Sequence, residues 1–387
     1  MTQLRIPAVY MRGGTSKGVF FRAEDLPPDS TVRERLLLRT VGSPDPYGKQ
    51  IDGMGGATSS TSKVVIISKS SRPECDVDYL FGAVSINIPV IDWSGNCGNL
   101  ASAVGPFAIS EGMVNVPENG VAVIRIWQVN TERKIIAHVP MKNGSVVEEG
   151  DFHLDGVAFP SAEIKLEFLD PGGADEEGGG SLFPTGNLMD TLDVAEVGNI
   201  NATLINAGNP TVFIDARELG LVGNELQRDI NDNRALLARC EAIRARGAVA
   251  MGLATSPAEA TANRPATPKL ALIAAPSDYL SSGGKSVSKT DIDLNVRILS
   301  MGQLHHAMTG TGAIAIAVAA AIPGTLVHRS SASRPNPGEI RIGHPSGIIT
   351  GAAEAALRDG KWAVTKAVMS RSARRLMEGW VRVPAKT

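Results

Sequence analysis

Apolar and polar residues alternate along several stretches of the chain, a period that predicts strands with one buried face. Residues 4–10 (LRIPAVY) follow this period and run into MRGGTSKGVFF, residues 11–21, where a glycine turn between two strand-like runs predicts a hairpin. A segment of turn formers and small polar residues, 43–63, then leads into the strand KVVIIS, which begins at Lys63. Further strands are expected at 79–86, within 121–168, over 201–214, and in EIRIGHP and KWAVTKAVM.

Helical patterns alternate with these strands. Short or medium helices are expected at 31–40, 224–247 and 291–300, and an apolar helix follows a sharp turn near Cys97. Within residues 300–325 a second helix is apolar on all sides, so other structure must enclose it.

The two halves of the chain follow the same plan. Each begins with a strand and a glycine turn, Gly13-Gly14 or Gly208-Asn209, and each later has a polar glycine turn that feeds a wholly apolar helix. The pattern predicts an internal duplication of a β-rich unit wrapped around one helix. Because regular βαβ alternation is missing, a Rossmann array is excluded and an α+β fold is expected.

Composition narrows the class of protein. A length of 387 residues favours two domains, and the net charge of −2 with 4% aromatic residues argues against nucleic acid or an anionic membrane as partner. The three cysteines favour a reducing compartment. The first residues carry no secretory signal, and the most apolar run, 313–322, is too short to span a bilayer, so a soluble cytoplasmic protein is expected.

The two glycine turns before the apolar helices, NCGN at 96–99 and TGTG at 309–312, are candidate anion sites. The first turn of a helix leaves backbone N–H groups unpaired, and the helix dipole favours negative charge there. One such turn alone would be explained as a helix cap, whereas a matched pair across a cleft favours a ligand with carboxylates at both ends. The expected donors are Asn96, Gly98, Asn99, Thr309, Gly310, Thr311 and Gly312.

Three side chains are candidates for a chemical role: Lys63, Lys17 and Cys97. Lys63 enters an apolar strand, where loss of water favours the neutral amine that a base requires. The alternative is a solvated lysine at a strand end, which is the more common situation. Lys17 is an anion contact or a surface residue, with the surface favoured. Cys97, at a helix start, is an activated thiolate or a small buried hydrophobe, and residue type does not separate the two.

Metal and nucleotide motifs are missing. The six histidines show no metal spacing, and the adjacent His305 and His306 are expected to point in different directions on a helix. The chain has no H-E-x-x-H, C-x-x-C, complete P-loop or G-x-G-x-x-G after a strand. No metal and no nucleotide cofactor are therefore expected.

The long motifs of the chain resemble the 2-methylaconitate cis–trans isomerase family, within the diaminopimelate epimerase-like fold. The matching segments run from MRGGTSKGVFF through SPDPYGKQIDGMGGATSSTSK, DWSGNCGNL, INAGNPTVFI, LHHAMTGTGAIAIA and GHPSG to MSRSARRLMEGWVRVP. The resemblance implies no cofactor and two pseudo-symmetric domains, each a β-barrel-like sheet around a central helix. We place them at 1–188 and 189–368, with a tail at 369–387 that returns to the first.

The resemblance also implies roles for particular residues. In the epimerase branch each half supplies one cysteine, but here the two positions hold Cys97 and Thr309, so inversion by paired thiols is in doubt. In the isomerase branch Lys63 is the expected acid/base group, with Cys97 beside the substrate. The substrate contacts expected in addition to the two turns are Gly14, Thr15, Ser16, Lys17, Ser62 and Asn209, which Pro210 follows in the fold's Gly-Asn-Pro turn.

The resulting hypothesis is an isomerase that moves an allylic proton on a small-molecule tricarboxylate, 2-methylaconitate, in propionate breakdown by the methylcitrate cycle. One alternative is a 4-oxalomesaconate tautomerase or a related double-bond isomerase. The alternative of another class is a non-catalytic polycarboxylate-binding protein. A homodimer is one possible assembly.

Overall fold

The computed structural model describes residues 3–172, 181–332 and 338–384, which form two compact units. The first comprises Met1–Leu166 and Ser370–Thr387, and the second Glu167–Met369. The sequence placed the division near residue 188, after the acidic glycine-rich segment, whose residues 173–180 lie outside the described part. The chain instead leaves the first unit within β9 (Ile164–Leu169) and re-enters it within β20 (Lys361–Arg371). Because a strand runs across each boundary between the units, no turn-forming or polar residues mark that boundary in the sequence.

The sheet of the first unit grows outward from β1 (Gln3–Gly13), which pairs antiparallel with β2 (Ser16–Arg22) and β21 (Ala373–Pro384). The predicted hairpin at residues 11–21 is therefore confirmed. The order continues through β3 (Lys63–Lys69), β4 (Val77–Val84), β6 (Gly120–Gln128) and β7 (Arg133–Lys142), with β2–β3 and β4–β6 parallel. Short elements complete the unit: η1 (Ala23–Asp25), β5 (Ile91–Asp92) and β8 (Ser145–Val146).

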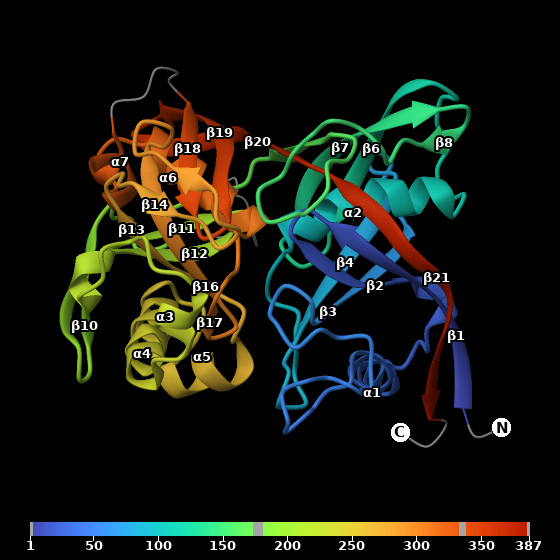
Figure 1. Cartoon of the computed structure of the whole chain (residues 1–387), viewed down its shortest axis with the longest axis horizontal. Helices are drawn as coiled ribbons and strands as arrows, with labels where there is room; N and C mark the ends of the chain where they lie inside the picture. The colour runs from blue at the N-terminus through green and yellow to red at the C-terminus, as the bar shows by residue number, and fades with distance from the viewer. Residues whose placement is uncertain (1–2, 173–180, 333–337, 385–387) are drawn as a thin grey trace. The chain divides into compact units, whose positions relative to one another are not determined.

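Helix α2 (Gly98–Ser110) is the buried centre of this unit. It packs against β1, β2, β4, β6, β7 and β21 (Figure 1). The rings of Phe107 on α2 and Phe20 on β2 lie 5.6 Å apart. Phe21 on β2 and Ile66 on β3 point to the opposite face of the sheet. There they join a second apolar cluster under α1 (Ser30–Val41). The sheet is thus buried on both faces here, with α2 on one and α1 on the other.

The second unit contains a sheet of β10 (Asp190–Val194), β11 (Gly198–Ala207), β12 (Asn209–Asp215), β13 (Lys269–Ala274), β16 (Leu294–Ser300), β18 (Glu339–His344), β19 (Gly347–Arg358) and β20. Its buried helix is α6 (Gly310–Ala321), which packs against β11, β12, β18 and β19 (Figure 1). The prediction that this apolar helix is enclosed is confirmed. The smaller elements are η2 (Ala216–Leu219), α5 (Pro257–Asn263), β14 (Tyr279–Leu280), β15 (Ser286–Val287), β17 (Gln303–Leu304) and α7 (Leu326–Ser330).

Two helix predictions in this unit are corrected. The helix expected at 224–247 is divided into α3 (Gln227–Asn231) and α4 (Arg234–Ala250), because Asn233 caps α4 by accepting a 3.0 Å hydrogen bond from the Leu236 N–H. The helix expected at 291–300 is wrong, since residues 294–300 form β16. Apolar and polar residues alternate from Leu294 to Ile298, which is the period of a strand, and the polar members Asn295 and Arg297 are buried as well.

Among the described residues, no helix is long and apolar enough to cross a membrane. All three cysteines are buried and free.

Candidate functional site

The first helix turn that the sequence singled out begins at Cys97, the N-cap of α2. Its Sγ accepts a hydrogen bond from the Leu100 N–H at 3.5 Å, and its carbonyl accepts one of 3.2 Å from the Tyr79 hydroxyl. Burial raises the pKa of Tyr79 well above its usual value, which keeps this hydroxyl protonated and able to donate. Cys97 is 8% exposed. The cysteine therefore sits in a fixed position at the positive end of a buried helix.

The β1–β2 hairpin turn lies directly against this helix start. A Cβ on Gly13 would come within 2.7 Å of the Asn99 carbonyl oxygen, and one on Gly14 within 2.5 Å of Asn99 Oδ1. Gly14 also has a φ of +51°, which favours glycine. Next to it, Thr15 Oγ1 accepts a 2.9 Å hydrogen bond from Asn99 Nδ2. The structure thus brings together the predicted residues Gly14, Thr15 and Asn99, and it gives the glycine pair a steric cause.

Lys63 lies on the same sheet face as α2. It begins β3, is 8% exposed, and holds its Nζ 4.8 Å from the centre of the Phe81 ring. A Cβ on Gly18 would lie 3.1 Å from Lys63 Cβ and 3.2 Å from Leu100 Cδ1, so this glycine leaves space for the lysine beside the first turn of α2. Contact with an aromatic ring at this distance contributes about 0.5–2 kcal/mol to holding the lysine side chain in place.

The other predicted substrate contacts near Lys63 are Ser62, Ser16 and Lys17, and their surroundings differ. Ser62 donates to the Val84 carbonyl at 2.8 Å and accepts from Gln50 Nε2 at 2.7 Å, so it fastens the turn-rich loop to β4. Ser16 is buried at the hairpin. Lys17 lies on the opposite face of β2 from Gly18, with its Nζ 5.3 Å from the centre of the Tyr10 ring. The buried side-chain amide of Gln50, a residue that the sequence did not single out, holds this loop in place by hydrogen bonds.

Arg371 is the residue of this region that sequence reasoning missed. It is fully buried, and its Nε donates to Asn99 Oδ1 at 3.0 Å. Burial lowers the pKa of its guanidinium to about 10, which still leaves it charged at neutral pH. Its segment, MSRSARR, contains three arginines within five residues, and composition cannot tell which of them is buried.

The second unit repeats this local arrangement at the start of α6. Thr309 is the N-cap and accepts a 3.2 Å hydrogen bond from the Gly312 N–H. On the β11–β12 turn, Gly208 has a φ of +69°, and Asn209 Nδ2 donates to Thr311 Oγ1 at 3.0 Å. Hairpin and helix are therefore joined by an Asn–Thr bond in both units, with the two residue types exchanged.

Two histidines precede this turn, and their predicted orientation is wrong. His305 and His306 lie before α6, and their rings stack with centres 4.8 Å apart. Burial lowers the pKa of His306. Within the described residues, no group of three or more His, Cys, Asp or Glu side chains is arranged to hold a metal ion.

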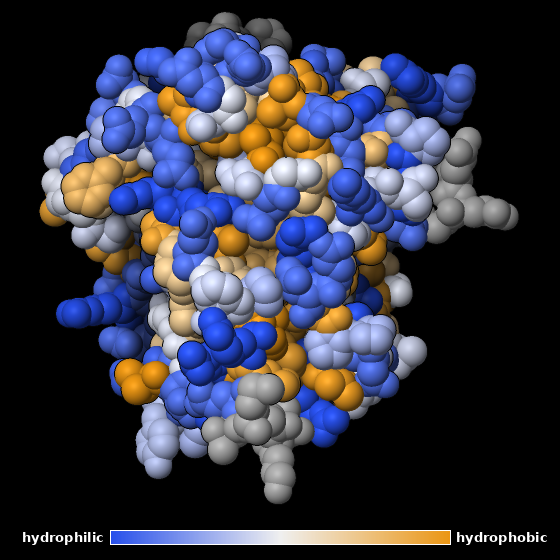
Figure 2. Space-filling model, turned by 90° about the vertical axis from the view of Figure 1, so that its right-hand side faces the viewer, coloured by the Kyte–Doolittle hydropathy of each residue, from blue (hydrophilic) through white to orange (hydrophobic). Residues whose placement is uncertain are grey.

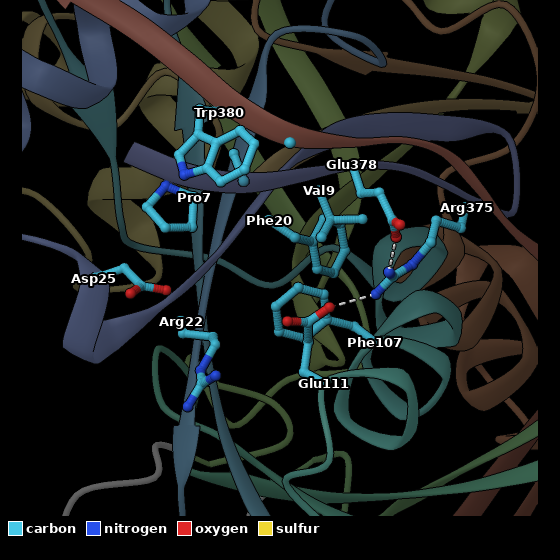
Figure 3. A pocket seen from close by; sticks show the side chains of 12 residues that line it. Pro7, Val9, Phe20, Arg22, Asp25, Phe107, Glu111, Arg375, Glu378 and Trp380 are labelled. Atoms are coloured by element: carbon cyan, nitrogen blue, oxygen red, sulfur yellow. Dashed lines mark hydrogen bonds and ion pairs between the residues drawn. The ribbon is translucent and has the colours of Figure 1, made fainter. Parts of the chain in front are cut away.

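A cavity of about 480 Å³ lies elsewhere in the first unit (Figure 3). Its apolar wall includes Phe20, Phe107 and Trp380, and Arg375 on its rim pairs with Glu111 and Glu378. Glu111 follows the last residue of α2, so the 13-residue helix puts about 20 Å between this rim and Cys97. None of the predicted site residues lines the cavity.

Each unit thus consists of a buried helix with a polar glycine turn at its N-terminus, packed in a mixed sheet. The fold agrees with a crystal structure of a hydroxyproline epimerase from Agrobacterium vitis, with a TM-score of 0.55 at 12% identity over 99% of this chain and 93% of that one. The chain belongs to the PrpF protein family, whose model matches residues 3–384.

Relatives at higher identity span the whole length. The 2-methyl-aconitate isomerases of Cupriavidus necator and Shewanella oneidensis are 59% and 58% identical over 99% of this chain and 98% of theirs. A 4-oxalomesaconate tautomerase of Pseudomonas putida is 36% identical over 98% of this chain and 97% of its own. The crystal structure of a methylitaconate-delta-isomerase has a TM-score of 0.76 at 40% identity, covering 99% of this chain and 97% of that one.

Proposed function

We propose that this protein is an isomerase that converts 2-methylaconitate between its cis and trans forms without a cofactor. The observation that carries the proposal is the identity of 59% to an enzyme of that name across 99% of the chain. The motifs that support it are long and lie in both units. With this substrate, the protein would act in propionate breakdown.

Lys63 is the proposed base. Its neutral amine takes a proton from the substrate carbon next to the double bond, and the electron pair of that C–H bond spreads into a carboxylate-stabilised dienolate. The former double bond becomes single and rotates. The Lys63 ammonium then returns its proton to the same carbon, so the reaction needs no oxidant, eliminates no group and yields only the other isomer. General acid–base catalysis of this kind contributes about 10²–10⁴ in rate.

The charge that develops on the substrate requires donors that are already oriented. In this proposal the Gly98 N–H and the N-terminal turn of α2 bind the carboxylate next to the reacting carbon. The amides of residues 310–312 at the start of α6 stay proposed carboxylate donors of the second unit. Thr309, in the position of a second epimerase cysteine, leaves the proton transfer to Lys63, with Cys97 as a neighbour of the substrate.

A tautomerase reaction is the second candidate, and the full-length relative from Pseudomonas putida favours it. The same dienolate gives a shifted double bond or a tautomer when the proton returns to a different atom. The two activities therefore need the same base and differ in substrate. A non-catalytic polycarboxylate-binding protein is the remaining alternative, and a homodimer is proposed as its assembly or that of the enzyme.

Separate incubation with cis-2-methylaconitate and with 4-oxalomesaconate tests the proposal, since both conjugated acids absorb in the ultraviolet. The proposal predicts conversion of 2-methylaconitate to an equilibrium mixture of isomers, and slower or no change of oxalomesaconate. Faster turnover of oxalomesaconate would assign the tautomerase reaction instead. Binding of both acids without any turnover would leave the binding protein as the explanation.

A further inference from the structure

Arg371 is held between the hairpin turn and the start of α2 by contacts on several sides. Its Nε donates to Asn99 Oδ1 at 3.0 Å, and one terminal nitrogen donates to the Ser370 carbonyl at 2.9 Å. A Cβ on Gly14 would lie 3.0 Å from Arg371 Cδ. The adjacent Ser372 carbonyl accepts from the Gly14 N–H at 2.8 Å and from Ser102 Oγ at 3.3 Å. The guanidinium therefore has one well-defined place beneath the first turn of α2.

The other terminal nitrogen of Arg371 is buried and has no hydrogen-bond partner among the described residues. No carboxylate of the described residues pairs with this guanidinium, and the group that favours its charge is Cys97. A buried charge without a counter-charge is unfavourable, and proteins normally pair it. Here the cation is instead placed beside the positive end of a helix, which adds to the positive potential.

A scaffold role alone does not account for this arrangement. Packing between Gly14 and Asn99 needs the volume of a long side chain, which an uncharged one supplies without the cost of burying a cation. Positive charge from two sources at one point is favourable only when an anion is bound near it. The arrangement is thus complete with a ligand carboxylate at the first turn of α2.

We propose that Arg371 is a positioning residue that holds Asn99 in orientation and supplies a buried positive charge for binding a substrate carboxylate at the N-terminus of α2. The proposal deepens the function proposed above and rests on it for the identity of the substrate. Arg371 acts through Asn99 and through its field, because its own nitrogens are covered. The ligand class is a polycarboxylate, whose affinity depends on this charge.

The test measures binding by calorimetry, with tricarballylate as the probe. This saturated tricarboxylate has no double bond and cannot react, so its binding is independent of turnover. The variants are Arg371→Met, which keeps the length and removes the charge, and Arg371→Lys, which keeps the charge. Asn99→Asp leaves Arg371 in place and gives it a carboxylate partner. Arg374→Met is the control, because it removes the same charge from an exposed position three residues away.

The expected loss of affinity is about tenfold or more for Arg371→Met and Asn99→Asp, since tenfold corresponds to about 1.4 kcal/mol. Arg371→Lys should lie between these variants and the wild type, and Arg374→Met should bind like the wild type. A graded loss, largest in Arg371→Met and smaller in Arg371→Lys, is not expected from a residue that only fills space.

Wild-type affinity in folded Arg371→Met and Asn99→Asp would overturn the proposal. Equal losses in Arg371→Lys and Arg371→Met would also overturn it, because charge would then not be the property that matters. These outcomes are separate from failure of the proposed function, which would appear as absence of 2-methylaconitate turnover in the wild type while tricarballylate still binds.

Discussion

Asn99 Nδ2 donates a 2.9 Å hydrogen bond to Thr15 Oγ1 and so joins the N-terminal turn of α2 to the β1–β2 hairpin. In the second unit the hairpin residue is Asn209 and the helix residue is Thr311, 3.0 Å apart. Both bonds are buried, and both fix a glycine turn against the start of a buried helix. Helix N–H groups bind a ligand best when they are already held in place before it arrives. These two hydrogen bonds hold them.

Replacing Thr311 by Val should destabilise the protein by about 1–3 kcal/mol, because it keeps the shape and removes the acceptor of a buried amide donor. Thr191→Val is the matched control, since its hydroxyl bonds Asn201 at 3.1 Å in an exposed position. Urea unfolding of both variants measures the difference. Equal stability of the two would show that the Asn209–Thr311 bond contributes nothing beyond a surface hydrogen bond.

Gly14→Ala should be far more damaging than Gly48→Ala. Both glycines have positive φ, +51° and +63°, so both substitutions carry a backbone cost of about 1–2 kcal/mol. Only at Gly14 does the new Cβ meet other atoms, 2.5 Å from Asn99 Oδ1, whereas nothing lies within 4 Å at Gly48. Overpacking adds about 1–3 kcal/mol. Thermal unfolding and tricarballylate affinity should both separate the pair, and similar results for the two would refute the close contact.

Much of this site follows from local sequence rules. The polar glycine turns before α2 and α6 were predicted as helix starts, and Lys63 was predicted at the start of a strand, because caps and turns act over a few residues. Arg371 was not, because its environment is made by Gly14 and Asn99, which are far away in the chain. The helix expected over β16 was wrong for a different reason: apolar and polar residues alternate from Leu294 to Ile298, and this strand period was available in the sequence but not used.

Cys97→Ser should lose less activity than a Lys63 variant. Serine preserves the N-cap acceptor for Leu100, and the account gives proton transfer to Lys63. The expected loss in kcat is therefore smaller than about 10², the lower end of what an acid–base residue contributes. Steady-state kinetics with 2-methylaconitate measure it, and Cys97→Ala separates capping from chemistry. A loss in Cys97→Ser as large as in a Lys63 variant would transfer the acid–base role to the thiol.

Cys240 should make stability fall at alkaline pH. Burial raises its pKa from 9.0 to about 12. Between these values the folded state keeps a proton that the unfolded state loses, so the stability that the group contributes below pH 9 is lost as pH rises. Between pH 8.5 and 10.5 the melting temperature of the wild type should therefore decrease more than that of Cys240→Ala. Parallel decreases would contradict a thiol that stays protonated.

Turnover of 2-methylaconitate by Lys63→Met shows whether Lys63 moves the proton. Lys69→Met is the control, because it removes the same charge from the exposed end of the same strand. We expect kcat to fall by about 10²–10⁴ in Lys63→Met and to stay near the wild-type value in Lys69→Met. Wild-type turnover by a folded Lys63→Met enzyme would contradict the account.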